Sequence, residues 1–388
     1  MVISPRIKGF ICITAHPDGC RESVRRQIEY VEKNGTIGNG PKNVLIIGAS
    51  TGYGLASRIT LAFGCGANTL GIMFEKPATA TRTATPGYYN TQAFEAFAKE
   101  KGLYAESING DAFSTACKEE TIRKIREDFG KVDMVVYSLA APRRTTPDGQ
   151  TYTSVLKTVG EPFTNISWNA KDNSISTVTV EPATEEEVEA TIKVMGGEDW
   201  CDWIDALHEA DVLSEHAVTV AYSYLGPELT YPIYKDGTIG QAKKNLKECC
   251  DRMNEKYQGQ GITSYVSVNK AVVTQASAAI PVVPLYFMIL YKVMKQKGLH
   301  EGCIEQMDRL FRTKLNGAHA EQDSEGFIRM DDWELREDVQ AEVMEIWKRI
   351  PQEGLAQTAD VDGYWEDFYH MFGFHYDNVD YDRDVALV

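Results

Sequence analysis

The chain has 388 residues, of which 43% are hydrophobic, and a formal net charge of -16. This size and composition predict a globular protein with a sizeable core, and the acidic excess argues against non-specific binding of nucleic acid, because polyanions would be repelled. The eight cysteines include no Cys-x-x-Cys pair, and the N-terminus lacks the basic start and long apolar run of a signal peptide. We therefore expect reduced thiols, no bound metal and a cytoplasmic location.

Residues 1–40 form an N-terminal segment with one predicted helix, over 23–33. After it, apolar runs alternate with helical patterns. Strands are predicted over 43–50, 68–75, 104–110 and 132–140, and helices over 53–64, 91–102 and 118–130. Such alternation is typical of βαβ units, so we predict an α/β fold with a Rossmann-type, doubly wound parallel sheet.

The pattern changes over residues 143–180, where short polar runs between turns predict an inserted β-hairpin region. Helices resume after Thr184, whose spacing to Glu187 matches a capping box. Further helices are predicted over 185–197, 200–213 and 241–257, and further strands over 216–226 and 261–273. Residues 300–388 are predicted as a helical C-terminal extension, and we expect a single domain over residues 1–388.

One segment resembles a membrane span and another resembles a calcium loop, but residues within each segment argue against these assignments. Residues 271–291 carry no charge, but Pro281 and Pro284 interrupt them, so a strand end and a pocket-lining helix are expected and no integral membrane span. The acidic run from Glu321 to Asp332 resembles a calcium loop but departs from the EF-hand rule at positions one, five and twelve. We expect a polar turn between strand-like segments there.

A glycine-rich loop, Gly48-Ala49-Ser50-Thr51-Gly52-Tyr53-Gly54, lies between the strand predicted over 43–50 and the helix after it. Its G-x-x-x-G-x-G spacing lets the backbone approach a pyrophosphate at a helix N-terminus, which predicts dinucleotide binding. The same residues satisfy G-x-S-x-G, the nucleophile elbow of α/β-hydrolases, with Ser50 as nucleophile. That alternative is disfavoured because an elbow follows several earlier strands.

The next predicted strands also end in residues suited to a dinucleotide. Phe74-Glu75 ends the second strand, and a carboxylate there accepts hydrogen bonds from a ribose and repels a 2′-phosphate, which favours NADH. Asp111-Ala112 follows the third strand, where adenine would lie. Leu139-Ala140 follows the fourth and supplies small residues beside the nicotinamide ribose.

Tyr234 and Lys243 are nine positions apart, which places them on opposite faces of one unbroken helix. The turn dipeptide Asp236-Gly237, with Thr238 as N-cap of a following helix, would break the chain between them. The spacing therefore permits a catalytic pair without requiring one.

The glycine loop and the other segments given below resemble those of the NADH-dependent trans-2-enoyl-CoA reductases. They also resemble the related single-chain enoyl-acyl-carrier-protein reductases, an elongated type of short-chain dehydrogenase. The resemblance covers almost the whole chain. Besides the glycine loop and Phe74-Glu75, it rests on residues 110–114, 137–142, 193–200, 221–224, 267–270 and 330–335.

The resemblance implies that Tyr234 and Lys243 are the family's Tyr-x8-Lys pair, with Lys243 also binding the cofactor and lowering the pKa of the tyrosine. It further implies that Tyr224 contacts the substrate thioester and that Val272-Val273-Thr274 closes over the nicotinamide. The implied reaction is reduction of the C2–C3 double bond of a trans-2-enoyl thioester by NADH, without metal or flavin.

The carrier of the acyl group is open at this point. Coenzyme A is favoured because residues 49–59 and 222–230 look closer to the enoyl-CoA branch, while acyl carrier protein is the alternative. Arg143, Arg144 and Lys247 are candidate contacts for either carrier. We expect a monomer or a weak homodimer, and a non-catalytic dinucleotide sensor stays as a further alternative.

Overall fold

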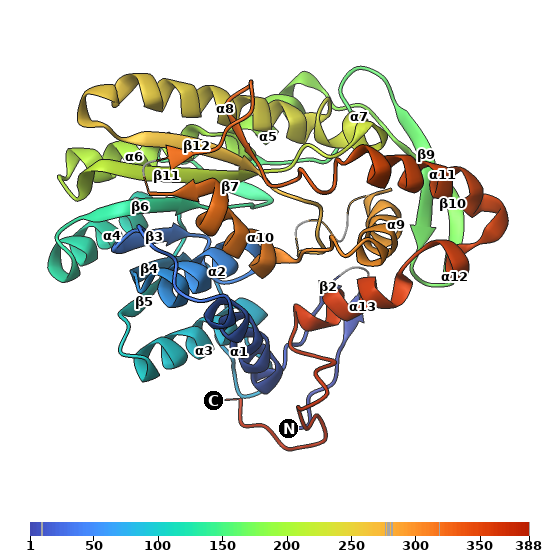
Figure 1. Cartoon of the computed structure of the whole chain (residues 1–388), viewed down its shortest axis with the longest axis horizontal. Helices are drawn as coiled ribbons and strands as arrows, with labels where there is room; N and C mark the ends of the chain where they lie inside the picture. Colours follow the sequence, from blue (N-terminus) through green and yellow to red (C-terminus); the bar gives the residue numbers. More distant parts are fainter. Residues whose placement is uncertain (9–10, 276, 278–279, 281, 318, 388) are drawn as a thin grey trace.

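The structure is a computed structural model that describes residues 1–8, 11–275, 277, 280, 282–317 and 319–387. Its centre is a seven-stranded parallel sheet with helices on both faces (Figure 1), and its strand order is β15-β12-β11-β6-β3-β4-β5. The predicted α/β, Rossmann-type class is confirmed. The strands are β3 (Asn43–Ile47), β4 (Asn68–Met73), β5 (Ala105–Asn109), β6 (Val132–Tyr137), β11 (Leu213–Ser223), β12 (Thr263–Val268) and β15 (Phe327–Arg329).

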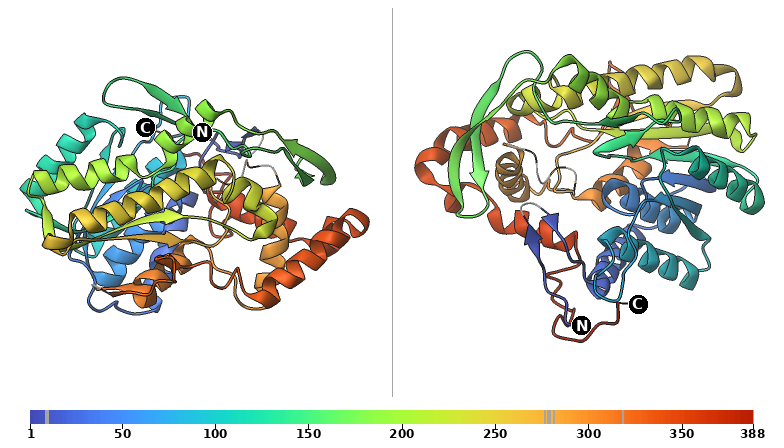
Figure 2. Two further views of the ribbon diagram at one scale, coloured as in Figure 1. Left: turned by 90° about the horizontal axis from the view of Figure 1, so that it is seen from above. Right: turned by 180° about the vertical axis from the view of Figure 1, so that it is seen from behind.

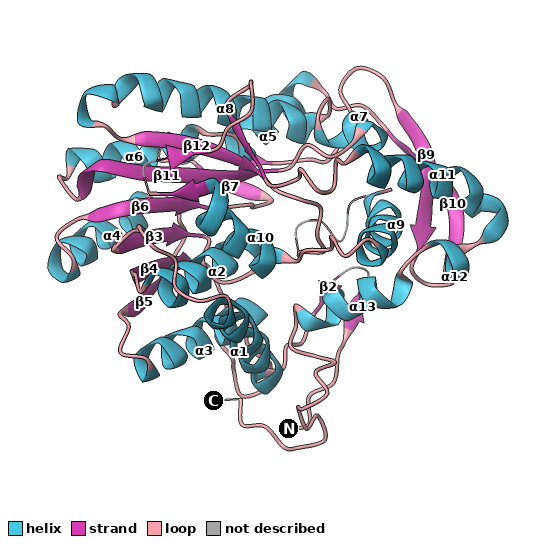
Figure 3. Ribbon diagram, viewed as in Figure 1, coloured by secondary structure: helices cyan, strands magenta, loops and turns pink. Residues whose placement is uncertain are grey.

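The sheet is buried on both faces because alternate side chains of each strand point to opposite sides. In β3, Val44 and Ile46 join one core, while Leu45 and Ile47 join the other. The first core includes helices α1 (Pro17–Lys33), α2 (Gly52–Ile59), α3 (Pro86–Glu100) and α10 (Cys303–Arg309); the second includes α4 (Thr115–Asp128), α6 (Glu198–Glu209) and α8 (Thr238–Lys256). Figure 3 shows these two helical layers around the strands.

A third core lies around helix α9 (Val283–Gln296), whose residues 283–291 are all buried. It includes Trp168 and residues of helices α11 (Glu337–Glu353), α12 (Leu355–Thr358) and α13 (Val361–His370). Tyr234, on the short helix α7 (Tyr231–Tyr234), and Ala271 also belong to it. This core therefore packs directly against residues that follow the carboxyl ends of β11 and β12. No helix in the described residues is long and apolar enough to cross a membrane.

The interval 143–180 holds two antiparallel hairpins, β7 (Arg143–Thr145) with β8 (Thr151–Thr153) and β9 (Phe163–Asn169) with β10 (Ser174–Val180). Figure 2 shows the longer hairpin standing at the edge of the molecule beside the C-terminal helices. The apolar positions Trp168 and Ile175 are paired in register and lie in or against the third core. Helix α5 (Glu185–Met195) follows, and its predicted capping box between Thr184 and Glu187 is present.

Three details differ from the sequence analysis. The C-terminal extension is not only helical, because it supplies β15, which pairs in parallel with β12 at the sheet edge. Short hairpins β1–β2 (Ile7–Lys8, Ile11–Cys12) and β13–β14 (Leu315–Asn316, His319–Ala320) were not anticipated. Thr238 is not the N-cap of α8: Gly237 is, because the Thr238 hydroxyl donates to the carbonyl of Val155 at 2.6 Å and accepts from the amide of Lys157.

Gly54 generates a stability prediction. A Cβ added there would lie 1.9 Å from the Gly48 carbonyl oxygen, because α2 packs directly onto the loop that precedes it. We predict that Gly54→Ala lowers the free energy of unfolding by about 2 kcal/mol, the usual scale of overpacking. The measurement is the thermal unfolding midpoint. Gly259→Ala is the control, because Gly259 has open space around it, and equal melting temperatures for the two variants would contradict the prediction.

Candidate dinucleotide and active site

The glycine loop lies at the carboxyl edge of the sheet, pressed between two strand ends. The amides of Gly48 and Ala49 donate to the carbonyl of Ile72 at 3.0 and 2.9 Å. Gly48 has φ +84°, and a Cβ on it would lie 2.1 Å from the Ser138 carbonyl oxygen, so only glycine fits. Thr51 caps α2 without a side-chain hydrogen bond. The first amides of α2 are therefore free to bind an anion, as a pyrophosphate site requires.

Glu75 lies beside this loop. The Ser50 hydroxyl donates to its carboxylate at 2.7 Å, and a Cβ on Gly87 would collide with the same carboxylate. Asn109 fixes the Glu75 backbone, because its side-chain amide accepts from the Glu75 amide at 2.8 Å and donates to the Glu75 carbonyl at 2.9 Å. The sequence analysis missed Asn109. Its only signal was its position at the end of the neighbouring strand.

The Ser50 geometry also bears on the hydrolase alternative. A nucleophile elbow needs a histidine in hydrogen-bond reach of the serine. Among the described residues, the partner of the Ser50 hydroxyl is the Glu75 carboxylate. The geometry therefore does not support the hypothesis that Ser50 is the nucleophile of an α/β-hydrolase.

The other predicted cofactor residues lie at the same edge with different exposure. The Phe74 side chain is 78% exposed. Asp111 accepts from the amide of Phe113 at 3.0 Å, which shapes the turn after β5. Ala112 is buried, and its carbonyl accepts from buried Lys118 and Trp203. Leu139 is half-buried and Ala140 is exposed just beyond β6.

The segment Val272-Val273-Thr274 follows β12 and approaches the glycine loop at Gly52. Val272 and Val273 are buried. A Cβ built on Gly52 would lie 3.9 Å from the Thr274 methyl group. The amide of Val273 donates to the hydroxyl of Tyr291 at 2.9 Å, which anchors the segment to α9. Residues 276, 278, 279 and 281 of the uncharged stretch lie outside the described residues.

Tyr234 and Lys243 lie on separate helices, as a catalytic pair requires. The Tyr234 ring is buried and packs perpendicular to the Tyr224 ring, with centroids 4.6 Å apart. The Lys243 ammonium donates to the carbonyl of Tyr222 at 3.2 Å, while adjacent Lys244 is exposed. Lys243 is thus the lysine that turns towards the sheet edge.

The pKa values of the pair differ from the expectation. Burial lowers the pKa of Lys243 to about 8. Burial, and then the Glu334 carboxylate, raise the pKa of Tyr234 far above its ordinary value. The expectation that Lys243 lowers the pKa of the tyrosine is wrong for this arrangement, because desolvation of the phenol dominates. Tyr234 therefore keeps its proton at neutral pH and can act as a hydrogen-bond donor.

Glu334 is a buried carboxylate that the sequence analysis did not single out. It accepts from the hydroxyl of Tyr224 at 2.9 Å, from the hydroxyl of Tyr286 at 2.6 Å and from the amide of Ala271 at 2.7 Å. It therefore connects the tyrosine beside Tyr234 with the segment that approaches the glycine loop. The segment 330–335 was informative only as part of the resemblance.

Of the candidate carrier contacts, two are already engaged. Arg144 is 2% exposed and forms ion pairs with Glu198 at 3.0 Å and Asp202 at 3.2 Å. Lys247 pairs with Asp251 at 2.6 Å. Arg144 is thus a structural group, and it is not available to a phosphate or to an acidic protein.

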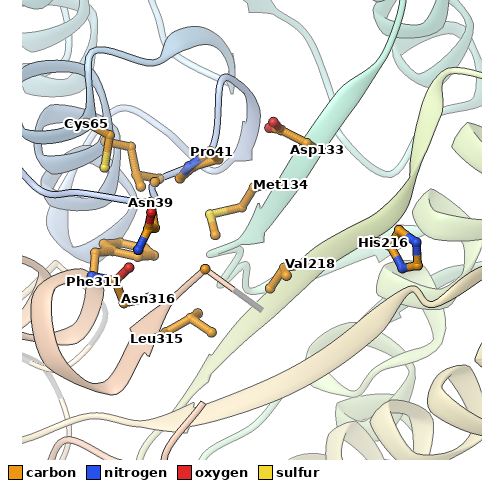
Figure 4. A pocket seen from close by; sticks show the side chains of 13 residues that line it. Asn39, Pro41, Cys65, Asp133, Met134, His216, Val218, Phe311, Leu315 and Asn316 are labelled. Carbon is orange, nitrogen blue, oxygen red and sulfur yellow. The ribbon is translucent and has the colours of Figure 1, made fainter. Parts of the chain in front are cut away.

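A cavity of about 150 Å³ lies at the opposite edge of the sheet (Figure 4). Asp133 and Met134 from the start of β6 line it, together with His216 from the first half of β11. The Asp133 carboxylate is occupied by the amides of Lys42 and Asn43. This cavity is therefore separate from the site at the glycine loop.

The acidic run from Glu321 to Asp332, which resembles a calcium loop in sequence, contains a turn. The Asp323 carboxylate accepts from the amides of Glu325 and Phe327 and pairs with Arg329. In the part of the chain that the structure describes, no group of three or more His, Cys, Asp or Glu side chains could hold a metal ion.

The fold and this site define a Rossmann-type protein with a dinucleotide-binding loop and a buried tyrosine–lysine pair beside it. Comparison with known proteins makes the assignment specific. Residues 82–316 match the model of the trans-2-enoyl-CoA reductase catalytic region, and residues 2–80 match the NAD(P)H binding domain of trans-2-enoyl-CoA reductase. The chain belongs to the trans-2-enoyl-CoA reductase family.

Relatives with both carriers in their names are similar over the full length. The chain is 53% identical to the trans-2-enoyl-CoA reductase [NADH] of Ruminiclostridium cellulolyticum, covering 100% of this chain and 98% of the relative. It is 54% identical to the enoyl-[acyl-carrier-protein] reductase [NADH] of Flavobacterium johnsoniae, with the same coverage. The crystal structure of a Clostridium acetobutulicum trans-2-enoyl-CoA reductase in complex with NADH superposes with a TM-score of 0.96 at 46% identity, covering 100% of this chain and 98% of that one.

A third family model, an enoyl reductase FAD binding domain, matches residues 322–385. The residues present do not fit a flavin. In the described part of this segment, no glycine-rich loop joins a strand to a helix. Its apolar side chains are instead buried in the third core, as for Val343, Ile350, Tyr364 and Phe368.

The depressed pKa of Lys243 generates a pH prediction. The unfolded chain holds the Lys243 proton up to a pH near 10.4, whereas the folded protein releases it near 8. The charged side chain therefore costs stability below pH 8, and this cost disappears as the pH rises from 8 towards 10.4. We expect Lys243→Met to melt at a higher temperature than the wild type at pH 7, with the difference shrinking above pH 8. Lys244→Met is the exposed control, and a difference independent of pH would contradict the prediction.

Proposed function

We propose that the protein reduces the C2–C3 double bond of trans-2-enoyl thioesters with NADH. The observation that carries this proposal is the buried Tyr234 packed on Tyr224, at the same carboxyl edge of the sheet as the glycine loop and Lys243. Full-length similarity to proteins named as NADH-dependent enoyl reductases supports it.

The reaction needs a hydrogen-bond donor at one atom. Bound NADH would supply a hydride for the β-carbon, and negative charge would then develop on the thioester carbonyl oxygen. A proton from Tyr234 or from water would complete the reduction at the α-carbon. In this proposal the Tyr234 hydroxyl donates to that oxygen, in a site from which packed side chains exclude water. Lys243 would hold the cofactor ribose. The apolar residues beyond β12, including Val272 and Val273, line the acyl and nicotinamide side.

NADH is proposed over NADPH because of Glu75. Its carboxylate lies beside Ser50 at the end of β4, where a 2′-phosphate would bring a second negative charge close to it. The Asn109 side chain holds the backbone of Glu75 in place.

For the carrier we propose coenzyme A, with acyl carrier protein as the second candidate. Relatives named for each carrier match equally well, and the proposed catalytic residues would contact only the thioester end that the two carriers share. We further propose a cytoplasmic location, with which eight free cysteines agree, and a monomer or weak homodimer. A non-catalytic sensor is disfavoured because both Tyr234 and Lys243 are present.

The activity is tested by following NADH absorbance with crotonyl-CoA. We expect oxidation by the wild type and a loss of roughly 100-fold or more in kcat for Tyr234→Phe, the scale for removing one donor from a developing oxyanion. Tyr231→Phe, on the same short helix, is the control and should keep wild-type kcat. A wild type inactive with both crotonyl-CoA and crotonyl-acyl carrier protein would contradict the proposal.

Cofactor preference is tested by Glu75→Ala. Removing the carboxylate should raise kcat/KM with NADPH relative to NADH by about tenfold, since one charge repulsion of moderate strength is relieved. Glu119→Ala removes the same charge from an exposed position on α4 and should leave the ratio unchanged. An unchanged ratio in Glu75→Ala would remove this role from Glu75.

A further inference from the structure

Glu334 contacts both Tyr224, which packs on Tyr234, and the segment that follows β12. It lies after β15, its side chain is fully buried, and its two oxygens have different partners. One oxygen accepts from the hydroxyls of Tyr224 and Tyr286, and the other accepts from the amide of Ala271. Three donors compensate the buried carboxylate, whereas an unpaired buried charge would be strongly destabilising.

Burial and the neighbouring groups act on the pKa of Glu334 in opposite directions. Burial raises its pKa, and Asp331 adds to the rise, while Lys270 and the hydrogen bonds from Tyr286 and the Ala271 amide oppose it. The ionised form accepts from all three donors and has no proton of its own, whereas a protonated carboxyl would need an acceptor for its O–H. Every hydrogen-bond contact of the Glu334 carboxyl among the described residues is with a donor. The observed contacts are therefore those of a carboxylate.

The contacts determine where the tyrosine protons point. A phenol has one proton, and the Tyr224 proton is directed to Glu334. The Tyr224 oxygen can then only accept a hydrogen bond from the site. The Tyr234 hydroxyl, in contrast, has no hydrogen-bond partner among the contacts recorded for the described residues, although its ring packs on that of Tyr224. Tyr234 thus has a proton free for a ligand.

We propose that Glu334 assigns the roles of the two tyrosines: it binds the proton of Tyr224 and so leaves Tyr234 as the single donor to the thioester carbonyl. Glu334 is a positioning residue, because it acts through Tyr224 and does not reach the reacting atoms itself. The inference rests on the proposed enoyl thioester reduction and adds to it a reason why one tyrosine of the pair donates.

The same carboxylate also fixes the segment after β12. Its bond to the Ala271 amide and the bond from the Val273 amide to Tyr291 hold alternate residues of this segment. Glu334→Gln separates this role from the first. An amide nitrogen cannot face the Ala271 N–H, since both are donors, so the glutamine oxygen stays on Ala271 and its NH₂ group faces the tyrosine oxygens. The Tyr224 proton is then released into the site, where it competes with that of Tyr234.

The test is a double-mutant cycle of Glu334→Gln and Tyr224→Phe, assayed with crotonyl-CoA and NADH. We expect Glu334→Gln alone to lower kcat by roughly tenfold or more, because a second donor misplaces the carbonyl, with KM for NADH changed less than threefold. In the Tyr224→Phe background there is no proton to release, so Glu334→Gln should change kcat less than threefold.

Tyr286→Phe is the matched control, because it removes the other hydroxyl from the same carboxylate oxygen and leaves Tyr224 in place; it should keep kcat within threefold. If Glu334→Gln does not fold, Glu334→Asp is used, because it keeps the charge. It should retain more than a third of wild-type kcat, and adding Tyr224→Phe to it should change kcat by the same factor as adding Tyr224→Phe to the wild type. Wild-type kcat in Glu334→Gln, or the same loss in both backgrounds, would overturn the inference. A wild type inactive with both carriers would instead overturn the proposed function, and this inference with it.

Discussion

Parallel strands bring all their carboxyl ends to one edge of a sheet, and this constraint assembles the site. The glycine loop follows β3, Glu75 follows β4, Tyr224 follows β11 and Ala271 follows β12. The loop can lie at that edge only because glycine at position 48 lets its backbone come within contact of the end of β6. The rest of the site depends on this close approach, since it sets where α2 begins.

The third core closes the site on the side away from the cofactor loop. Its aromatic and aliphatic side chains, mainly from α9 and the C-terminal helices, exclude water from Tyr234 and Glu334. Desolvation then keeps Tyr234 protonated and makes charge on Lys243 costly. Both effects favour a site that stabilises negative charge on a ligand by donation from a neutral phenol, since such a donor is stronger where no water competes.

The sheet and the loop were predictable from the sequence because their signals are local. Apolar runs, helical periodicity and a glycine loop flanked by both are all read within about twenty residues, and Thr184 with Glu187 is equally local. What was missed is long-range. Asn109 acts on Glu75 across 34 positions, and Glu334 acts on Tyr224 across 110. No spacing rule links such pairs, because the topology of the sheet brings them together.

The other differences have physical causes of the same kind. Thr238 does not cap α8 because its hydroxyl is bonded to the backbone of Val155 and Lys157 in the loop after β8. β15 is only three residues long, so its sequence carries too little alternation to place it in the central sheet. The pKa of Tyr234 follows from burial by residues far away in the chain, and a nearby lysine could not reveal that burial.

The most direct test of the account follows the hydride itself. Crotonyl-CoA is reduced in ordinary water with NADH deuterated at C4, and the position of deuterium in the butyryl-CoA product is determined by mass spectrometry and NMR. The account predicts one deuterium at C3, because the hydride passes directly to the β-carbon while the proton at C2 comes from the protein or from water. Deuterium at C2, or its loss to solvent through an exchanging carrier such as a flavin, would contradict the account.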